Sequence, residues 1–167
     1  MVLHRIPVSV LDLAPVVTGS TPAEALRNSL DLAWRVDALG YRRYWVAEHH
    51  NMVGIASSSP AVLIGHLASS TRHLRVGSGG VMLPNHQPLV IAEQFGMLEA
   101  LHPGRIDLGI GRAPGTDGVT ARALRRSAAS IGESDFLEQL GELMGFFAGS
   151  FPEGHPYRSI GRVPGLL

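Results

Sequence analysis

Residues 44–51 read YWVAEHHN, an apolar run that ends abruptly in one acidic residue and two adjacent histidines. A short apolar run is typical of a buried strand, and we expect a strand over residues 44–47. In folds in which parallel strands alternate with helices, ligands bind at the carboxyl ends of the strands. Glu48, His49 and His50 follow this strand directly, so the segment predicts both an α/β fold and the place of a functional site.

The same order, an apolar run followed by an amphipathic one, occurs four times along the chain. It predicts strands at residues 5–11, 44–47, 74–78 and 105–111, and helices at residues 22–39, 60–70, 88–101 and 134–148. The first helix has a clear start, because Thr21 suits the N-cap position and Pro22 the first helical position. A Gly- and Pro-rich excursion over residues 112–118 delays the fourth helix. The pattern is (βα)4 and predicts a parallel sheet covered by helices.

Two architectures share this alternation, a doubly wound sheet and a (β/α)8 barrel. The length of 167 residues favours the doubly wound sheet, because a barrel needs about 250 residues. Against that sheet, residues 12–15 read DLAP and lack the Gly-x-Gly-x-x-Gly turn that brings a backbone close to a pyrophosphate. The periodicity by itself leaves both architectures open.

The composition excludes several classes of function. Fourteen Lys and Arg residues balance fourteen Asp and Glu residues, and no basic run is long enough to bind nucleic acid or an anionic membrane. The absence of Cys excludes disulfides, thiolate nucleophiles and Cys-ligated metals. The first residues lack the features of a signal peptide, and no apolar run approaches the roughly 20 residues that span a bilayer. We expect one cytoplasmic domain over residues 1–167.

Four phrases, in this order, resemble the bacterial-luciferase-like flavin-dependent monooxygenases: WVAEHH at 45–50, VGSGGVMLPNH at 76–86, AEQ at 92–94 and GRIDLGIGR at 104–112. The resemblance covers essentially the whole chain. It implies a (β/α)8 TIM barrel, usually dimeric, that binds reduced FMN or, in one branch, a deazaflavin. Family members are about twice as long, so the expected fold is the (βα)4 first half of a luciferase-like TIM barrel, with strands 5–8 absent from this chain. Completion by a second copy, completion by another chain, and truncation all remain open.

The resemblance identifies His49 as the functionally important histidine of the family, and we expect it to be catalytic. Histidine suits proton transfer because its unperturbed pKa lies near 6.5. The alternative is that His49 and His50 are polar residues at a strand end, satisfied by neighbouring backbone. Adjacent strand residues point to opposite faces, so the two cannot readily share one ion, and no metal site is predicted.

Five further residues are expected to bind the cofactor: Glu48, Ser78, Gly79, Gly80 and Arg112. Consecutive glycines let a backbone approach a flat ring closely. The resemblance places this segment beneath the isoalloxazine and implies a non-proline cis peptide there, and it implies that Arg112 reaches the flavin or its phosphate.

Each of these assignments has a structural alternative. Glu48 could be a buried carboxylate paired with Arg75 or Arg105, and Arg112 could form a surface salt bridge with Asp117. The glycines could form an ordinary loop. Asn85 and His86, just beyond that loop, could line the entrance of the same cofactor site, although many long loops carry such residues.

The function implied by the resemblance is a flavin-dependent monooxygenase or oxidoreductase that uses reduced FMN and O2 on a small organic substrate. A separate flavin reductase would supply the reduced FMN. The alternatives are a non-catalytic flavin-binding or assembly subunit, and an inactive fragment of such an enzyme. The expected partners are flavin, the substrate, and either a second copy of the chain or a complementing second half.

Overall fold

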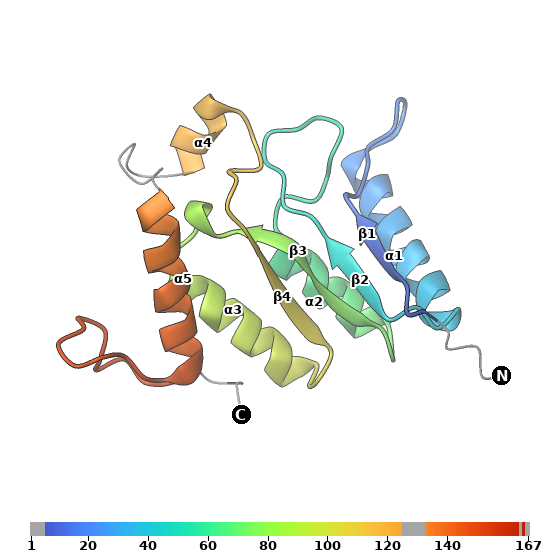
Figure 1. Cartoon of the computed structure of the whole chain (residues 1–167). Helices are drawn as coiled ribbons and strands as arrows, with labels where there is room; N and C mark the ends of the chain where they lie inside the picture. The colour runs from blue at the N-terminus through green and yellow to red at the C-terminus, as the bar shows by residue number, and fades with distance from the viewer. Residues whose placement is uncertain (1–5, 125–132, 164, 166–167) are drawn as a thin grey trace.

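The computed structural model describes residues 6–124, 133–163 and 165, and it forms one parallel sheet with helices (Figure 1). The elements, in chain order, are β1 (Ser9–Asp12), α1 (Pro22–Ala38), β2 (Arg43–Val46), α2 (Pro60–Ser70), β3 (Arg75–Met82), the 3-10 turn η1 (Leu83–Asn85), α3 (Pro88–Leu101), β4 (Ile106–Gly111), α4 (Gly118–Leu124) and α5 (Glu133–Ala148). None of the described helices is long and apolar enough to cross a membrane.

The order of the strands decides between the two architectures. The sheet runs β1-β2-β3-β4, and every neighbouring pair is parallel. A doubly wound sheet reverses its strand order at a switch point and has helices on both faces. Here the order is sequential, and α1, α2 and α3 lie on the same face of the sheet (Figure 1). The doubly wound alternative is therefore wrong, and the arrangement is that of half a TIM barrel.

The core lies between the sheet and these helices. Tyr44 and Val46 of β2 and Val76 of β3 are fully buried on the helix side, against residues such as Ile64 of α2. Side chains alternate along a strand, so the residues between them face the other way. That second face is open, and Leu11 of β1 is 56% exposed on it.

Two boundaries and one helix differ most clearly from the expectation. β1 begins at Ser9 rather than at residue 5, which lies outside the described residues, and Pro7 has no N–H to donate to a ladder. β3 continues to Met82, four residues beyond the predicted end. The helix α4 was not predicted; it starts where the carboxylate of Asp117 accepts the N–H groups of Val119 and Thr120.

The predicted start of α1 is confirmed in detail. The side chain of Thr21 accepts the N–H of Glu24 at 3.2 Å, and the carboxylate of Glu24 accepts the N–H of Thr21 at 2.8 Å. This reciprocal pair is a capping box, which satisfies two N–H groups that the first turn of a helix leaves without partners.

A buried polar pair joins β1 to β2 close to their carboxyl ends. The hydroxyl of Tyr44 donates to Oδ2 of Asp12 at 2.6 Å, while Oδ1 of Asp12 accepts the N–H of Ala14 at 2.8 Å. Burial, together with the bond to Asp12, raises the pKa of Tyr44, so its hydroxyl remains a donor. The pair fixes the chain as it leaves β1.

We expect Tyr44→Phe to lower the free energy of unfolding by about 1–2 kcal/mol, because the buried carboxylate of Asp12 loses a donor. Urea denaturation of the two proteins measures the difference. Tyr41→Phe is the control, because the described residues form no hydrogen bond with that hydroxyl. Equal losses in the two variants would show that the hydroxyl of Tyr44 contributes nothing specific.

Candidate functional site

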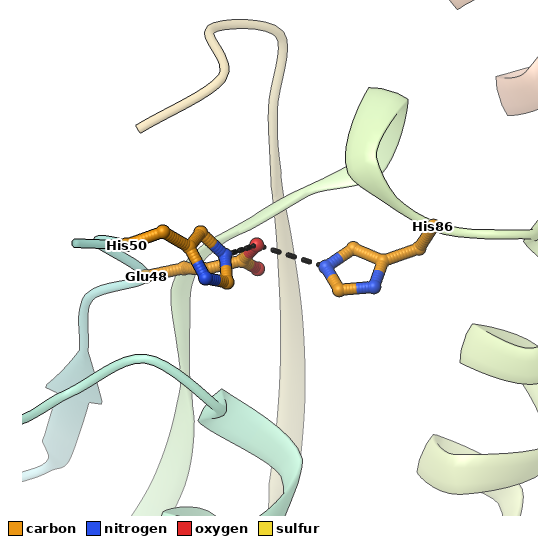
Figure 2. Close-up of side chains that lie close together, drawn as sticks. All are labelled: Glu48, His50 and His86. Carbon is orange, nitrogen blue, oxygen red and sulfur yellow. Dashed lines mark hydrogen bonds and ion pairs between the residues drawn. The ribbon is translucent and has the colours of Figure 1, made fainter. Parts of the chain in front are cut away.

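Glu48 is fully buried two residues after the end of β2, and two histidines bind it (Figure 2). Nε2 of His50 lies 2.7 Å from Oε1 of Glu48, and Nε2 of His86 lies 2.8 Å from the same oxygen. His86 follows η1, 38 residues along the chain. The cluster therefore joins the carboxyl ends of β2 and β3, which is where a barrel places its chemistry.

Further donors complete the surroundings of this carboxylate. The N–H of Met82 donates to Oε2 at 2.9 Å, and the amide of Asn85 lies 3.4 Å from Oε1. Burial by itself raises the pKa of Glu48, but the hydrogen bonds from His86, His50 and Met82 outweigh it and the pKa is lowered. Glu48 is therefore an ionised carboxylate in a buried position, neutralised by hydrogen-bond donors.

The loop that follows β4 covers the cluster. The N–H of His50 donates to the carbonyl of Gly115 at 3.1 Å, and Oγ1 of Thr116 donates to the carbonyl of His50 at 2.7 Å. Gly115 has φ +66°, and a Cβ there would lie 2.6 Å from the carbonyl oxygen of Glu48. Only glycine allows this close approach. The Gly- and Pro-rich loop over residues 112–118 therefore packs directly against the backbone of Glu48.

Gly79 and Gly80 lie within β3, beside the open face of the sheet that the helices do not cover. The peptide bond between Gly79 and Gly80 is cis, as the resemblance implied. Gly79 is exposed, whereas a Cβ on Gly80 would lie 2.9 Å from the carbonyl oxygen of Gly109. Ser78 is fully buried; its hydroxyl donates to that carbonyl at 2.9 Å and accepts the N–H of Gly109 at 3.1 Å. Ser78 thus ties β3 to β4, and Gly79 presents bare backbone.

His49 and Arg112 stand apart from the carboxylate cluster. The N–H of His49 donates to the carbonyl of Ser57 at 3.0 Å, and its buried Nδ1 has no hydrogen-bond partner among the described residues. Arg112 is exposed directly after β4. The roles of these two residues remain predictions.

One expected alternative is wrong, because Glu48 pairs with histidines and not with an arginine. Arg75 binds the carboxylate of Asp107 instead. Arg105 donates to the carbonyls of Ala68, Thr71 and Leu74. Both arginines belong to the amino ends of their strands, whereas Glu48 lies beyond a carboxyl end.

The cluster also has the composition of a possible metal centre. The ligand atoms of Glu48, His50 and His86 all lie within 4.8 Å of one another. However, the short contacts from both histidines to one oxygen already satisfy these groups as a hydrogen-bonded set. His49 takes no part, in agreement with the expected opposite directions of adjacent side chains.

Sequence reasoning undervalued two residues of this site. Asn85 and His86 come together with Glu48, and Asn85 also donates to the carbonyl of Pro114 at 2.9 Å. A usable signal was present, since both residues follow a predicted strand at the same end of the sheet as Glu48. The spacing of residues in the sequence could not show that the side chains of Asn85 and His86 turn back towards Glu48.

Parallel strands in sequential order, with a polar site at their carboxyl ends, define the class as one half of a TIM-barrel enzyme fold. The family profile described as luciferase-like monooxygenase matches residues 6–131. The chain belongs to the luciferase-like monooxygenase family, which confirms the resemblance carried by the four motifs.

Curated relatives share most of this chain and exceed its length. The uncharacterized protein YvbT of Bacillus subtilis is 62% identical over 94% of this chain and 45% of its own length. A luciferase-like monooxygenase of Escherichia coli K12 is 56% identical over the same two shares, 94% and 45%. The chain thus spans about half the length of the curated relatives it matches.

Solved structures share the fold. Apo-MsnO8 superposes with a TM-score of 0.82 at 43% identity, over 96% of this chain and 47% of its own. The oxygenating constituent of 3,6-diketocamphane monooxygenase from Pseudomonas putida, solved with FMN, has a TM-score of 0.77 at 19% identity, over 90% of this chain and 42% of its own. An F420-dependent secondary alcohol dehydrogenase has a TM-score of 0.65 at 15% identity, over 89% of this chain and 45% of its own. Their coverage agrees with half a barrel.

We expect Glu48→Gln to lower the free energy of unfolding at pH 7 by about 1–3 kcal/mol, because Gln cannot accept all the donors that surround the carboxylate. The pKa of Glu48 is lower in the folded chain than in the unfolded chain, so its stabilising effect is present above an ordinary Glu pKa and is lost as the pH falls through the folded value. Urea titrations from pH 7 towards pH 3 should show the gap closing. A gap that is constant with pH would contradict an ionised Glu48.

Proposed function

We propose that this chain supplies the ring-facing half of a flavin-dependent monooxygenase site. The observation that carries the proposal is the exposed backbone of Gly79, which carries no side chain and lies beside the apolar side chains of Leu11 and Trp45. A flat ring needs a surface of this kind, because a side chain at this position would hold it away from the sheet.

The residues present fit a flavin. A Cβ on Gly79 would lie 3.2 Å from Cβ of Trp45 and 3.4 Å from Cδ1 of Leu11, so glycine leaves a shallow seat between these side chains. Nδ1 of His49 is buried and has no hydrogen-bond partner among the described residues, so one polar group just beyond the carboxyl end of β2 is left unsatisfied. Arg112 lies at the carboxyl end of β4, where a guanidinium can bind phosphate or carbonyl oxygens.

Gly79 and Arg112 would hold reduced FMN, which would supply the two electrons needed to put one atom of O2 into the substrate and to release the other as water. In the proposed site, His49 holds or delivers a proton through its ring nitrogens, just beyond the carboxyl end of β2. His49 lies between Glu48 and His50, whose side chains are fixed by the cluster, so the backbone that carries it is held in position. The loop over residues 112–117 covers the cluster and limits the access of water to it.

FMN is favoured over a deazaflavin as the cofactor. The glycine segment, VGSGGVMLPNH at 76–86, resembles that of the FMN-using members of the family. A flavin reductase is the partner that would deliver reduced FMN, and the substrate is a small organic molecule. The strands that complete the barrel would contribute the rest of the cofactor and substrate site.

A second candidate function is a flavin-binding or assembly subunit without its own turnover. It is supported by the same exposed backbone of Gly79, which could seat a flavin ring without any proton transfer by His49. Reduced FMN and O2 added to the chain alone, and to the chain with a complementing half, discriminate the two functions. Turnover only in the presence of the complement would assign catalysis to the completed barrel.

In the completed barrel, we expect His49→Asn to lower monooxygenase turnover by about 100-fold or more and to change the Kd of FMN by less than about threefold. Asn keeps the size and polarity of the side chain but cannot transfer a proton near neutral pH. Oxygen incorporation measures turnover, and quenching of FMN fluorescence measures binding. His66→Asn is the control, since His66 is exposed on α2. If His49→Asn weakens FMN binding as much as turnover, His49 is a structural residue.

A further inference from the structure

Two imidazole nitrogens converge on one oxygen of Glu48 (Figure 2). Nε2 of His50 and Nε2 of His86 lie 2.7 Å and 2.8 Å from Oε1, and the amide nitrogen of Asn85 lies 3.4 Å from the same atom. Oε2 accepts the N–H of Met82 at 2.9 Å. These hydrogen bonds satisfy the charge of Glu48, but they do not explain why both rings gather on the same oxygen.

The three groups have the chemistry of a binding site for a divalent transition metal. Two histidines and one carboxylate form a ligand set that such ions take in proteins, with the remaining positions open to water or another ligand. The ligand atoms of Glu48, His50 and His86 all lie within 4.8 Å of one another. This spacing is small enough for all three to reach a single ion.

The distances within the cluster are close to those of a tetrahedral site. Around one Zn²⁺ ion, with ligand atoms at about 2.0–2.2 Å, neighbouring ligand atoms lie about 3.3 Å apart. The nitrogens of His50 and His86 lie 2.7 Å and 2.8 Å from Oε1. Each ring therefore needs to withdraw from Oε1 by only about 0.5 Å to admit the ion.

The positions of the two histidines allow this movement and the entry of an ion. The side chains of His50 and His86 are 15% and 29% exposed, whereas the carboxylate of Glu48 is fully buried. Both histidines follow their strands, since β2 ends at Val46 and β3 at Met82. Small shifts of these side chains therefore leave the register of the sheet unchanged.

The groups around the carboxylate support the same role. The N–H of Met82 holds Oε2, and hydrogen bonds of this kind orient carboxylates that bind metals. Asn85 donates to the carbonyl of Pro114 at 2.9 Å, but its Oδ1 is buried and has no hydrogen-bond partner among the described residues. The surroundings of Oε1 thus contain one further oxygen that the described donors do not satisfy.

We propose that Glu48, His50 and His86 bind one divalent transition-metal ion of the Zn²⁺ type, through Oε1 of the carboxylate and Nε2 of each ring. Each neutral imidazole then carries its proton on Nδ1, because Nε2 presents its lone pair to the ion. The ion replaces the two contacts between the rings and Oε1. It joins the loops after β2 and β3 and takes part in no step of the proposed reaction.

The site does not include the pair of adjacent histidines that the sequence made conspicuous. His49 and His50 point in different directions and do not share the ion. The second ring comes from His86, 38 residues after Glu48, and spacing in the sequence gives no reason to pair them. Neither FMN nor turnover enters the argument, so the metal site is tested separately from the proposed function.

The ligand set also predicts which ions bind. Mg²⁺ and Ca²⁺ take six or more ligands that are almost entirely oxygen, whereas this cluster offers one carboxylate oxygen and two nitrogens. Imidazole suits Zn²⁺ and Co²⁺. We therefore expect Zn²⁺ and Co²⁺ to compete for one site and Mg²⁺ to displace neither.

The probes are Zn²⁺ and Co²⁺ themselves, added to the full 167-residue chain after treatment with a chelator. We expect calorimetry to give one Zn²⁺ ion per chain, and bound Co²⁺ to show the visible absorption of an ion with four or five ligands. His86→Gln should weaken Zn²⁺ binding by about 100-fold or more, because losing a ligand costs at least as much as losing an outer partner. His50→Gln is the second variant and should have the same effect.

His66→Gln is the matched control, since His66 is exposed on α2 and lies outside the cluster. It should leave the stoichiometry and the Kd of Zn²⁺ unchanged, which separates the cluster from binding by surface histidines. Zn²⁺ should raise the Tm of the parent chain and of His66→Gln, but not the Tm of a variant that unfolds cooperatively and lacks a ligand. The proposal is overturned if the parent chain binds neither ion, if His86→Gln and His50→Gln bind Zn²⁺ as the parent does, or if His66→Gln abolishes binding.

Discussion

The buried carboxylate of Glu48 is the constraint on which the functional end of this half-barrel depends. A charge with no solvent exposure must be met by donors, and Glu48 recruits them from segments far apart in the chain: His50, Met82, Asn85 and His86. Because these donors belong to the ends of β2 and β3, one side chain sets the relative position of two loops. The cover over residues 112–117 then closes on the backbone of Glu48 and His50.

Buried charges are paired differently at the two ends of the sheet. At the carboxyl ends, one carboxylate has several donors and is satisfied within the described chain. At the amino ends, two guanidinium groups share the carboxylate of Asp107, whose pKa is lowered by Arg75 and Arg43 although burial opposes this. The first end presents the candidate site, and the second joins the first residues of β2 and β3 to β4 through Asp107. Separation of this kind lets the two ends be altered independently.

Local signals in the sequence predicted much of the fold because they act over a few residues. Thr21 and Glu24 form the expected capping box, and the cis peptide falls at the glycine pair that the family resemblance marked. The start of β1 and the existence of α4 were not predicted. A proline near a strand end and an Asp that caps a short helix are weak signals, which tertiary contacts decide.

The sequence by itself determined the alternation of strands and helices, the parallel sheet and the end of the sheet at which Glu48 and His49 lie, since periodicity and element order are properties of the chain. Only the tertiary structure decided which groups neutralise Glu48. The sequence left Glu48 open to a cofactor or to a pair with Arg75 or Arg105, and the outcome follows from register. Arg75 begins its strand and meets Asp107, whereas His86 lies past the end of that strand and meets Glu48. Distances across 38 residues are set by packing, which no local pattern encodes.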